Sequence, residues 1–318
     1  MHRAFTTSLR PMLVAVTVLG IAGGPSPSLA QVPPFITAWG GFGPGDAQFL
    51  NPVAVAVDAA GVVYVGDDHA NVVKRFTRSG AYLSQWPAFD PKGTAIGPDG
   101  NVYLTQGGFG APVVGRFTPG GALVAQWRVG MQITGIAVDK DGSVYVADNL
   151  GPLRKFSATG TLLGQWGTQG TGPGQFEFLD GVAVDGMGHV YTAEIVNNRV
   201  QKFTTSGVYI TQWGFAGSGN GQFDEPVRLV TSPDGALVYV VDNSNSRVQV
   251  FTNSGSYLGQ WGTAGGDSGQ FRNPIGIAVD GFGNVFVADT NNGRIQVFGD
   301  AATPARPITW GALKQRFR

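Results

Sequence analysis

Tryptophan recurs at near-regular intervals along this chain, and that spacing limits the fold more than any other feature. The seven tryptophans lie 39 to 49 residues apart, at Trp39, Trp86, Trp127, Trp166, Trp213, Trp261 and Trp310. A period of about 40–50 residues with strand-like content indicates a β-propeller or another repeat array. The spacing therefore predicts six copies of one supersecondary unit.

Each copy shows the same order of strand-like segments and turns. In the last copy, IGIAVD leads into a turn at Asp280–Gly283, and VFVA and RIQVF follow at 285–288 and 294–298. The preceding copy adds a fourth segment, SYLGQWG, which contains Trp261. Runs rich in β-branched and aromatic residues are typical of strands. The pattern predicts an all-β fold, a six-bladed β-propeller of four-stranded antiparallel blades with strands a to d in chain order.

The residues of these copies resemble the NHL repeat family. Its pattern, GxFxxPxGIAVDxxGxVxVADxxNxRIQxF, is met almost completely at Gly269–Phe298 and well at Gly174–Phe203 and Gly221–Phe251. The copies near 87–117 and 128–156 lack the GQF segment. The resemblance implies a six-bladed propeller over residues 35–298. It implies no single function, since the family includes enzymes, sensor domains and RNA-binding scaffolds.

Two segments compete to be the outer strand of the sixth blade. Trp310 follows Phe298 by twelve residues, whereas in the first five repeats the tryptophan follows the matching phenylalanine by ten. The approach to Trp310 also contains Pro304 and Pro307, which cannot donate to a β-ladder. We therefore predict that the N-terminal strand, residues 35–39, closes the ring.

The two ends of the chain differ from the repeats. Residues 1–30 combine a basic start, an apolar run at 12–24 and small residues at 28–30, which is typical of a secretory signal peptide. A membrane anchor is the alternative, although the run is shorter than the ~20 residues that span a bilayer. We expect a propeller domain over 31–300 and a basic tail over 301–318, which is either frayed or a docking segment.

The charge and the cysteine content limit the cellular locations and the binding partners that we expect. Removing the signal peptide takes away Arg3 and Arg10, which leaves 19 basic and 21 acidic residues. This balance argues against nucleic-acid binding, which needs a basic face. The chain has no cysteine, so a lipoprotein anchor is not expected. We expect a monomer, secreted or periplasmic, with no transmembrane segment after signal removal.

An acid and an arginine recur five residues apart in the b–c loops of blades four to six. The pairs are Glu194 and Arg199, Asp242 and Arg247, and Asp289 and Arg294. We interpret them as structural pairs, and a polar binding face is the alternative. Blades one and three keep the acid but have Val72 and Pro152 at the arginine position, and blade two has Gln106 at the acid position.

The short d–a connections of blades two and three predict a groove on the upper face, where the d–a and b–c loops emerge. We expect ligand contacts from blades one to three, at Asp68, His69, Lys92, Phe109, Arg128 and Gln132. Arg228 lies near the axis, where the other blades have glycine or alanine. Together with Asp180 it predicts a charge pair at the central funnel, either a ligand site or an internal ion pair.

The residues favour binding over catalysis. After signal removal only His69 and His189 remain, on opposite faces, so a three-histidine zinc site cannot be assembled. Strand a offers mostly Gly, Ala and Val, which cannot bind calcium. We expect no metal and no cofactor, and an exported non-catalytic binding module for a protein, peptide or glycan. An NHL-type lyase or hydrolase acting at the upper face, or a structural cell-envelope protein, are the alternatives.

Overall fold

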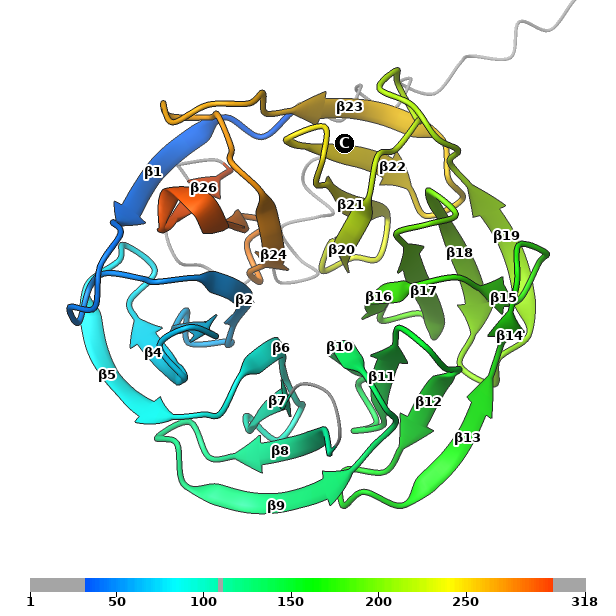
Figure 1. The fold of residues 1–318 in the computed structure, drawn as a ribbon, viewed down its shortest axis with the longest axis horizontal. Helices are drawn as coiled ribbons and strands as arrows, with labels where there is room; N and C mark the ends of the chain where they lie inside the picture. Colours follow the sequence, from blue (N-terminus) through cyan, green and yellow to red (C-terminus); the bar gives the residue numbers. More distant parts are fainter. Residues whose placement is uncertain (1–31, 108–110, 300–318) are drawn as a thin grey trace, which may run out of the picture.

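Six four-stranded antiparallel sheets surround a central axis in the computed structural model of the chain, which describes residues 32–107 and 111–299 (Figure 1). The all-β, six-bladed prediction is confirmed. The helical structure of these residues is one short 3-10 turn, η1 (Thr290–Asn292), and none of their helices is long and apolar enough to cross a membrane. The predicted signal peptide and basic tail lie outside the described residues.

Blades one to five are continuous in sequence, and their strands run from the axis to the rim (Figure 1). Their strands are, blade by blade, β2 (Pro52–Val57), β3 (Val63–Asp67), β4 (Val72–Phe76) and β5 (Tyr82–Pro87); β6 (Pro91–Ile96), β7 (Val102–Gln106), β8 (Val113–Phe117) and β9 (Leu123–Arg128); β10 (Ile133–Val138), β11 (Val144–Asp148), β12 (Leu153–Phe156) and β13 (Leu162–Trp166); β16 (Leu179–Val184), β17 (His189–Glu194), β18 (Arg199–Thr204) and β19 (Tyr209–Trp213); β20 (Pro226–Thr231), β21 (Leu237–Asp242), β22 (Arg247–Thr252) and β23 (Tyr257–Trp261). Between blades three and four, β14 (Thr168–Gln169) and β15 (Gln175–Phe176) form a separate parallel pair.

The sixth blade joins the two ends of the propeller. Its inner strands are β24 (Pro274–Val279), β25 (Val285–Asp289) and β26 (Arg294–Phe298), and its outer strand is β1 (Phe35–Gly40). Trp39 lies opposite Ile295 in the ladder. The prediction that the N-terminal strand closes the ring is therefore confirmed, and the closure pairs an edge that would otherwise be open. Trp310, the competing candidate, lies outside the described residues.

The tryptophan period reflects packing between neighbouring blades. Each of the six described tryptophans contacts the phenylalanine at the end of strand c in the next blade, from Trp39 and Phe76, with ring centroids 4.6 Å apart, to Trp261 and Phe298, at 5.5 Å. In five blades the ring also covers a glycine in the c–d turn. A Cβ on Gly121 would lie 2.5 Å from Trp86, so this turn admits no side chain.

The predicted acid–arginine pairs are buried ion pairs at the upper ends of strands b and c. Arg199 Nε lies 2.8 Å from Glu194 Oε1, and the corresponding distances are 2.6 Å for Arg247 and Asp242 and 2.7 Å for Arg294 and Asp289. The three acids are 0% exposed. Buried charges require partners and hydrogen bonds, because an unpaired charge is costly away from water.

Each pair also holds the connection that enters its own blade. Arg199 Nη2 donates to the carbonyl oxygens of Gly172 and Gln175, at 3.1 and 2.8 Å, and Glu194 accepts the backbone N–H of Glu177 at 3.2 Å. Blade five repeats the arrangement with Arg247. The pairs therefore fix the d–a connections that form the upper face.

Blades one and three supply the missing cation two positions later. Arg154 Nη1 lies 2.5 Å from Asp148 Oδ2. In blade one, the buried Lys74 donates to the carbonyl oxygens of Gly45 and Gln48. Blade two has no acid and no cation at these positions, so at the upper ends of strands b and c a buried acid occurs only in blades that also have a nearby cation on strand c. Residues two apart in a strand lie on the same face of the sheet. A cation at position 74 or 154 can therefore replace the arginine that blades four to six have two positions earlier.

We expect Trp39→Ala to destabilise the whole propeller. Loss of the ring that joins blade six to blade one should cost about 3 kcal/mol and lower the melting temperature by about 6–10 °C. Circular dichroism melts of the mature protein measure the effect. Leu83→Ala, on the exposed side of outer strand β5, is the matched control and should melt like the wild type. Equal melting of all three proteins would contradict closure by β1.

We expect Arg247→Val to cost about 3–5 kcal/mol, because it leaves the buried Asp242 carboxylate without its cation. The double variant Asp242→Gln/Arg247→Val recreates the combination of Gln106 and Val113 in blade two and should be more stable than the single variant. Lys140→Ala, in an exposed ion pair, should change stability by less than about 0.5 kcal/mol. Urea unfolding measures the stability of the three variants. A double variant that is less stable than Arg247→Val would refute the hypothesis that the buried acid and its cation balance each other.

Candidate functional site

Several residues predicted to contact a ligand meet at the upper mouth of the central channel. Lys92, on β6, lies 3.0 Å from Asp68 Oδ2 and 2.6 Å from Asp90 Oδ1. Asn51 donates to the other oxygen of Asp68 at 2.7 Å. His69 lies 3.8 Å from Asp68 and is 70% exposed. The lysine is thus paired with two carboxylates of the protein itself.

Arg228 crosses the ring from blade five. Its Nη1 lies 3.0 Å from Asp180 Oδ2 in blade four, and its Nη2 donates to the carbonyl oxygen of Lys92 in blade two at 3.1 Å. Burial raises the pKa of Asp180, while the charge of Arg228 and a hydrogen bond from Thr134 oppose that rise. The internal ion pair, one of the two alternatives drawn from the sequence, is present. A role for either residue in ligand binding stays a prediction.

The remaining predicted contacts are separate from this network. Arg128 ends β9 with an exposed side chain, and Gln132 precedes β10 with its backbone N–H bonded to Asp148. No hydrogen bond or ion pair between described residues joins either side chain to Asp68 or Lys92. Phe109 lies outside the described residues. These assignments stay predictions as ligand contacts.

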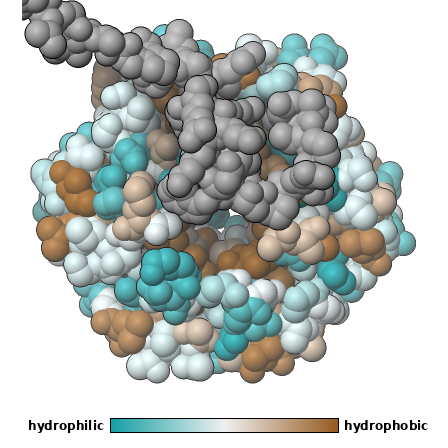
Figure 2. Space-filling model, turned by 180° about the vertical axis from the view of Figure 1, so that it is seen from behind, coloured by the Kyte–Doolittle hydropathy of each residue, from teal (hydrophilic) through white to brown (hydrophobic). Residues whose placement is uncertain are grey.

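Below Arg228 the channel widens into an aliphatic cavity. A space of about 230 Å³ is lined by the ends of the six inner strands, including Val57, Ile96, Val138, Val184 and Val279. Figure 2 shows the face opposite to that of Figure 1, with hydrophobic side chains along one side of the central hollow. Within residues 32–107 and 111–299, no three His, Cys, Asp or Glu side chains gather in a way that could hold a metal ion.

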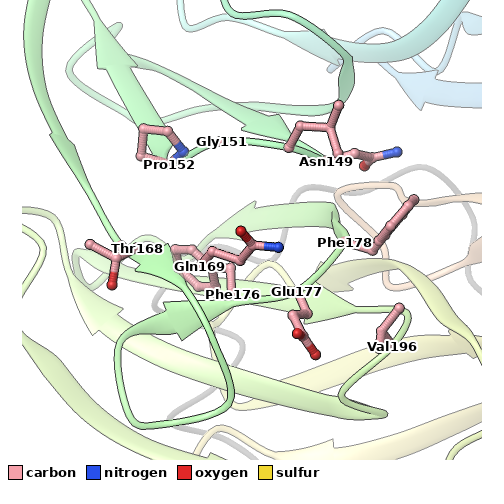
Figure 3. Close-up of a pocket in the computed structure, with 11 residues that line it drawn as sticks. Asn149, Gly151, Pro152, Thr168, Gln169, Phe176, Glu177, Phe178 and Val196 are labelled. Carbon is pink, nitrogen blue, oxygen red and sulfur yellow. The ribbon is translucent and has the colours of Figure 1, made fainter.

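The upper face carries a larger pocket, which the sequence analysis missed. It has a volume of about 490 Å³ and lies between blades three and four (Figure 3). Its walls are the b–c loop of blade three, the connection between the two blades, and one residue from the b–c loop of blade four. The lining residues are Asn149, Leu150, Gly151, Pro152, Gly167, Thr168, Gln169, Phe176, Glu177, Phe178 and Val196.

Apolar and polar side chains share this pocket, which we call the blade three–four pocket. Leu150, Phe178 and Val196 are 59%, 43% and 51% exposed. Figure 3 shows Asn149 and Phe178 on opposite sides of the opening, with the carboxylate of Glu177 on the side of Val196. Glu177 is the one ionisable residue in the lining, and no salt bridge or side-chain hydrogen bond between described residues engages it.

Phe178 adopts a backbone conformation that disfavours its side chain. Its φ is 50°, in the left-handed region. The same position, directly before strand a, also has positive φ in three other blades, where the residues are Asp90, Glu225 and Asn273. Asn and Asp tolerate this region far better than a bulky aromatic residue, for which the cost is about 1–2 kcal/mol.

The repeat architecture imposes this conformation. The carbonyl oxygen of Phe178 accepts the backbone N–H of Ile195 at 3.1 Å, and Glu225 accepts that of Asn243 in the same way at 3.2 Å. The backbone is therefore shared between blades, and only the side chain differs. An alignment of the residue before each strand a would have shown one aromatic residue among polar ones, which is the signal that the sequence analysis overlooked.

Comparison with protein families finds an NHL repeat at residues 271–298, which covers most of blade six. Comparison with curated proteins finds no match. The predicted resemblance to NHL repeats thus has direct support in the blade that best fits the pattern.

Several solved structures resemble this chain in fold, although their sequence identity to it is low. A protein of unknown function from Bacteroides thetaiotaomicron is 18% identical, with a TM-score of 0.66 over 83% of this chain and 76% of its own. An auxiliary nutrient binding protein from the same organism is 15% identical, with a TM-score of 0.59 over 79% and 69%. A virginiamycin B lyase from Staphylococcus aureus is 16% identical, with a TM-score of 0.54 over 80% and 85%.

At such identities these likenesses concern the fold alone, and the different descriptions of the three proteins show that this fold serves more than one function. The arrangement of the sheets, the closure by β1 and the family match at residues 271–298 agree with one another. The chain is a six-bladed β-propeller that carries an NHL repeat in its last blade.

Proposed function

We propose that this propeller is an exported, non-catalytic binding module that holds a protein, peptide or glycan in the blade three–four pocket. The observation that carries the proposal is Phe178, an aromatic residue in the left-handed region that lines the pocket and is 43% exposed. A strained residue that contributes little to the core is typical of a site kept for function.

The size and lining of the pocket suit a ligand. Binding sites for small ligands are commonly about 300–1,000 Å³ and combine apolar walls with a few polar groups. The volume of about 490 Å³ lies within that range. Leu150, Val196 and Phe178 provide exposed apolar surface, and Asn149 and Gln169 provide amide groups that both donate and accept hydrogen bonds.

The pocket is also held rigidly before any ligand arrives. Arg199 donates to the carbonyl oxygen of Thr171 and to those of Gly172 and Gln175, and Asn197 donates to Gly170 at 3.1 Å. These bonds fix the connection that forms one wall. A preorganised wall lowers the entropy cost of binding.

The chemistry of the lining favours binding over catalysis. Catalytic sites bring together a nucleophile or an acid–base group and a partner that activates it. The lining contains one ionisable residue, Glu177, and no His, Lys, Ser or Cys. The predicted contacts at the channel mouth are a weaker candidate for a binding site, because Asp68, Lys92 and Arg228 already have partners within the protein.

Export is the second part of the proposal, and it rests on residues 1–30. We expect the mature protein to begin at Gln31 after cleavage by a signal peptidase. Intact mass and N-terminal sequencing of protein recovered from the periplasm or medium of an expressing bacterium measure this. Retention of residues 1–30 in a membrane fraction would point to the anchor alternative instead.

We expect Phe178→Asn to raise stability and abolish binding together. Asparagine is the residue of blade six at this position, and relief of the strain should stabilise the protein by about 1 kcal/mol. Arrays of immobilised peptides and glycans, probed with mature protein, supply the ligands. We expect each wild-type ligand to be lost in the variant.

Phe215→Asn is the control for this experiment, because Phe215 is another exposed aromatic residue, on the connection into blade five. It should bind like the wild type. Ligands that bind equally well to Phe178→Asn would place the site elsewhere. Turnover of a bound ligand would contradict the non-catalytic assignment.

A further inference from the structure

We propose that the blade three–four pocket binds a short peptide segment in which a lysine or arginine lies beside a leucine, valine or aromatic residue. The inference rests on the proposed function, since it assumes that this pocket is the binding site. It adds the chemical class of the ligand, which follows from the charge, the apolar walls and the free strand edge of the pocket.

The charge of the pocket is a single carboxylate without a partner. The neighbouring acids Asp148 and Glu194 are held by Arg154 and Arg199. Glu177 differs, because among the described residues no cation lies within ion-pair distance of it. A carboxylate at an apolar wall attracts a cation more strongly than one in open water, because the local dielectric is lower. A lysine or arginine side chain supplies that cation.

The apolar walls favour a peptide over a sugar. Leu150, Pro152 and Val196 come from two different loops, and Phe176 and Phe178 lie on the connection between the blades. Aliphatic or aromatic side chains gain free energy against such walls. The hydroxyl groups of a sugar gain no such free energy from aliphatic walls, so these walls favour a ligand with apolar side chains.

The polar groups of the pocket match a peptide backbone. Thr168 and Gln169, which line the pocket, form β14, and β14 pairs only with β15 among the described strands. One edge of this exposed strand therefore has main-chain groups without a ladder partner, and extended peptides commonly pair with such edges. The amide of Asn149 lies across the opening from Phe178 (Figure 3) and adds a donor and an acceptor.

The test uses fluorescein-labelled hexapeptides that differ at one position, with central Leu-Lys, Leu-Gln or Leu-Glu, and mature protein carrying residues 31–318. We expect Leu-Lys to bind at least tenfold more tightly than Leu-Glu by fluorescence anisotropy. Glu177→Gln should weaken the Leu-Lys peptide about tenfold and leave the Leu-Gln peptide unchanged. Higher salt should reduce the preference for Leu-Lys.

Asp224→Asn is the matched control, because Asp224 occupies the position of Glu177 in blade five, outside the pocket. It should bind all three peptides like the wild type. Thermal melts show whether each variant is folded, so that loss of binding is not mistaken for unfolding.

The outcomes separate the two proposals. Binding that depends on Phe178 but not on Glu177 or the peptide charge would overturn this inference and leave the proposed function standing. The same holds if only glycans of the array bind, in a manner that depends on Phe178. If no peptide or glycan binds in a manner that depends on Phe178, both proposals fail.

Discussion

The packing of each outer tryptophan against the next blade is the contact on which the rest of the structure depends. Four strands alone cannot bury their faces, so each blade is stable only beside its neighbours. Six tryptophan–phenylalanine contacts close the ring, and the last of them joins Trp39 on the N-terminal strand to Phe76 in blade one. The fold is therefore complete only when the beginning and the end of the propeller meet in blade six.

Buried charge is arranged blade by blade on this frame. Five blades bury an acid at the upper end of strand b, and each has a cation on strand c nearby, which in blades one, four, five and six donates to the incoming connection. Blade two lacks both. Removing one member alone would leave a charge in a dry environment, so the two positions are expected to change together. Because the pairs grip the d–a connections, they give the upper face a fixed shape on which a site can be built.

The blade three–four pocket lies where the repeats differ from one another. Its lining comes from a b–c loop of blade three that contains Leu150 and Pro152, and from a connection whose last residue is Phe178. The other blades with positive φ at the Phe178 position have the polar residues Asp90, Glu225 or Asn273, and Asp and Asn suit that backbone. A repeat protein acquires a specific site where its sequence differs from the repeat consensus. The packing of the closed ring offsets the backbone strain at Phe178.

Much of the fold could be predicted from the sequence, because its contacts are local or periodic. Tryptophan spacing determined the number of blades, the prolines near Trp310 favoured closure by residues 35–39, and the five-residue spacing of Glu194 and Arg199 placed them opposite each other in a hairpin. Only the tertiary structure decided which loops meet. Arg228 reaches Lys92 across the ring, 136 residues away, and the pocket joins Leu150 to Val196 from separate blades. Such contacts depend on the curvature of the closed ring, which no local pattern encodes.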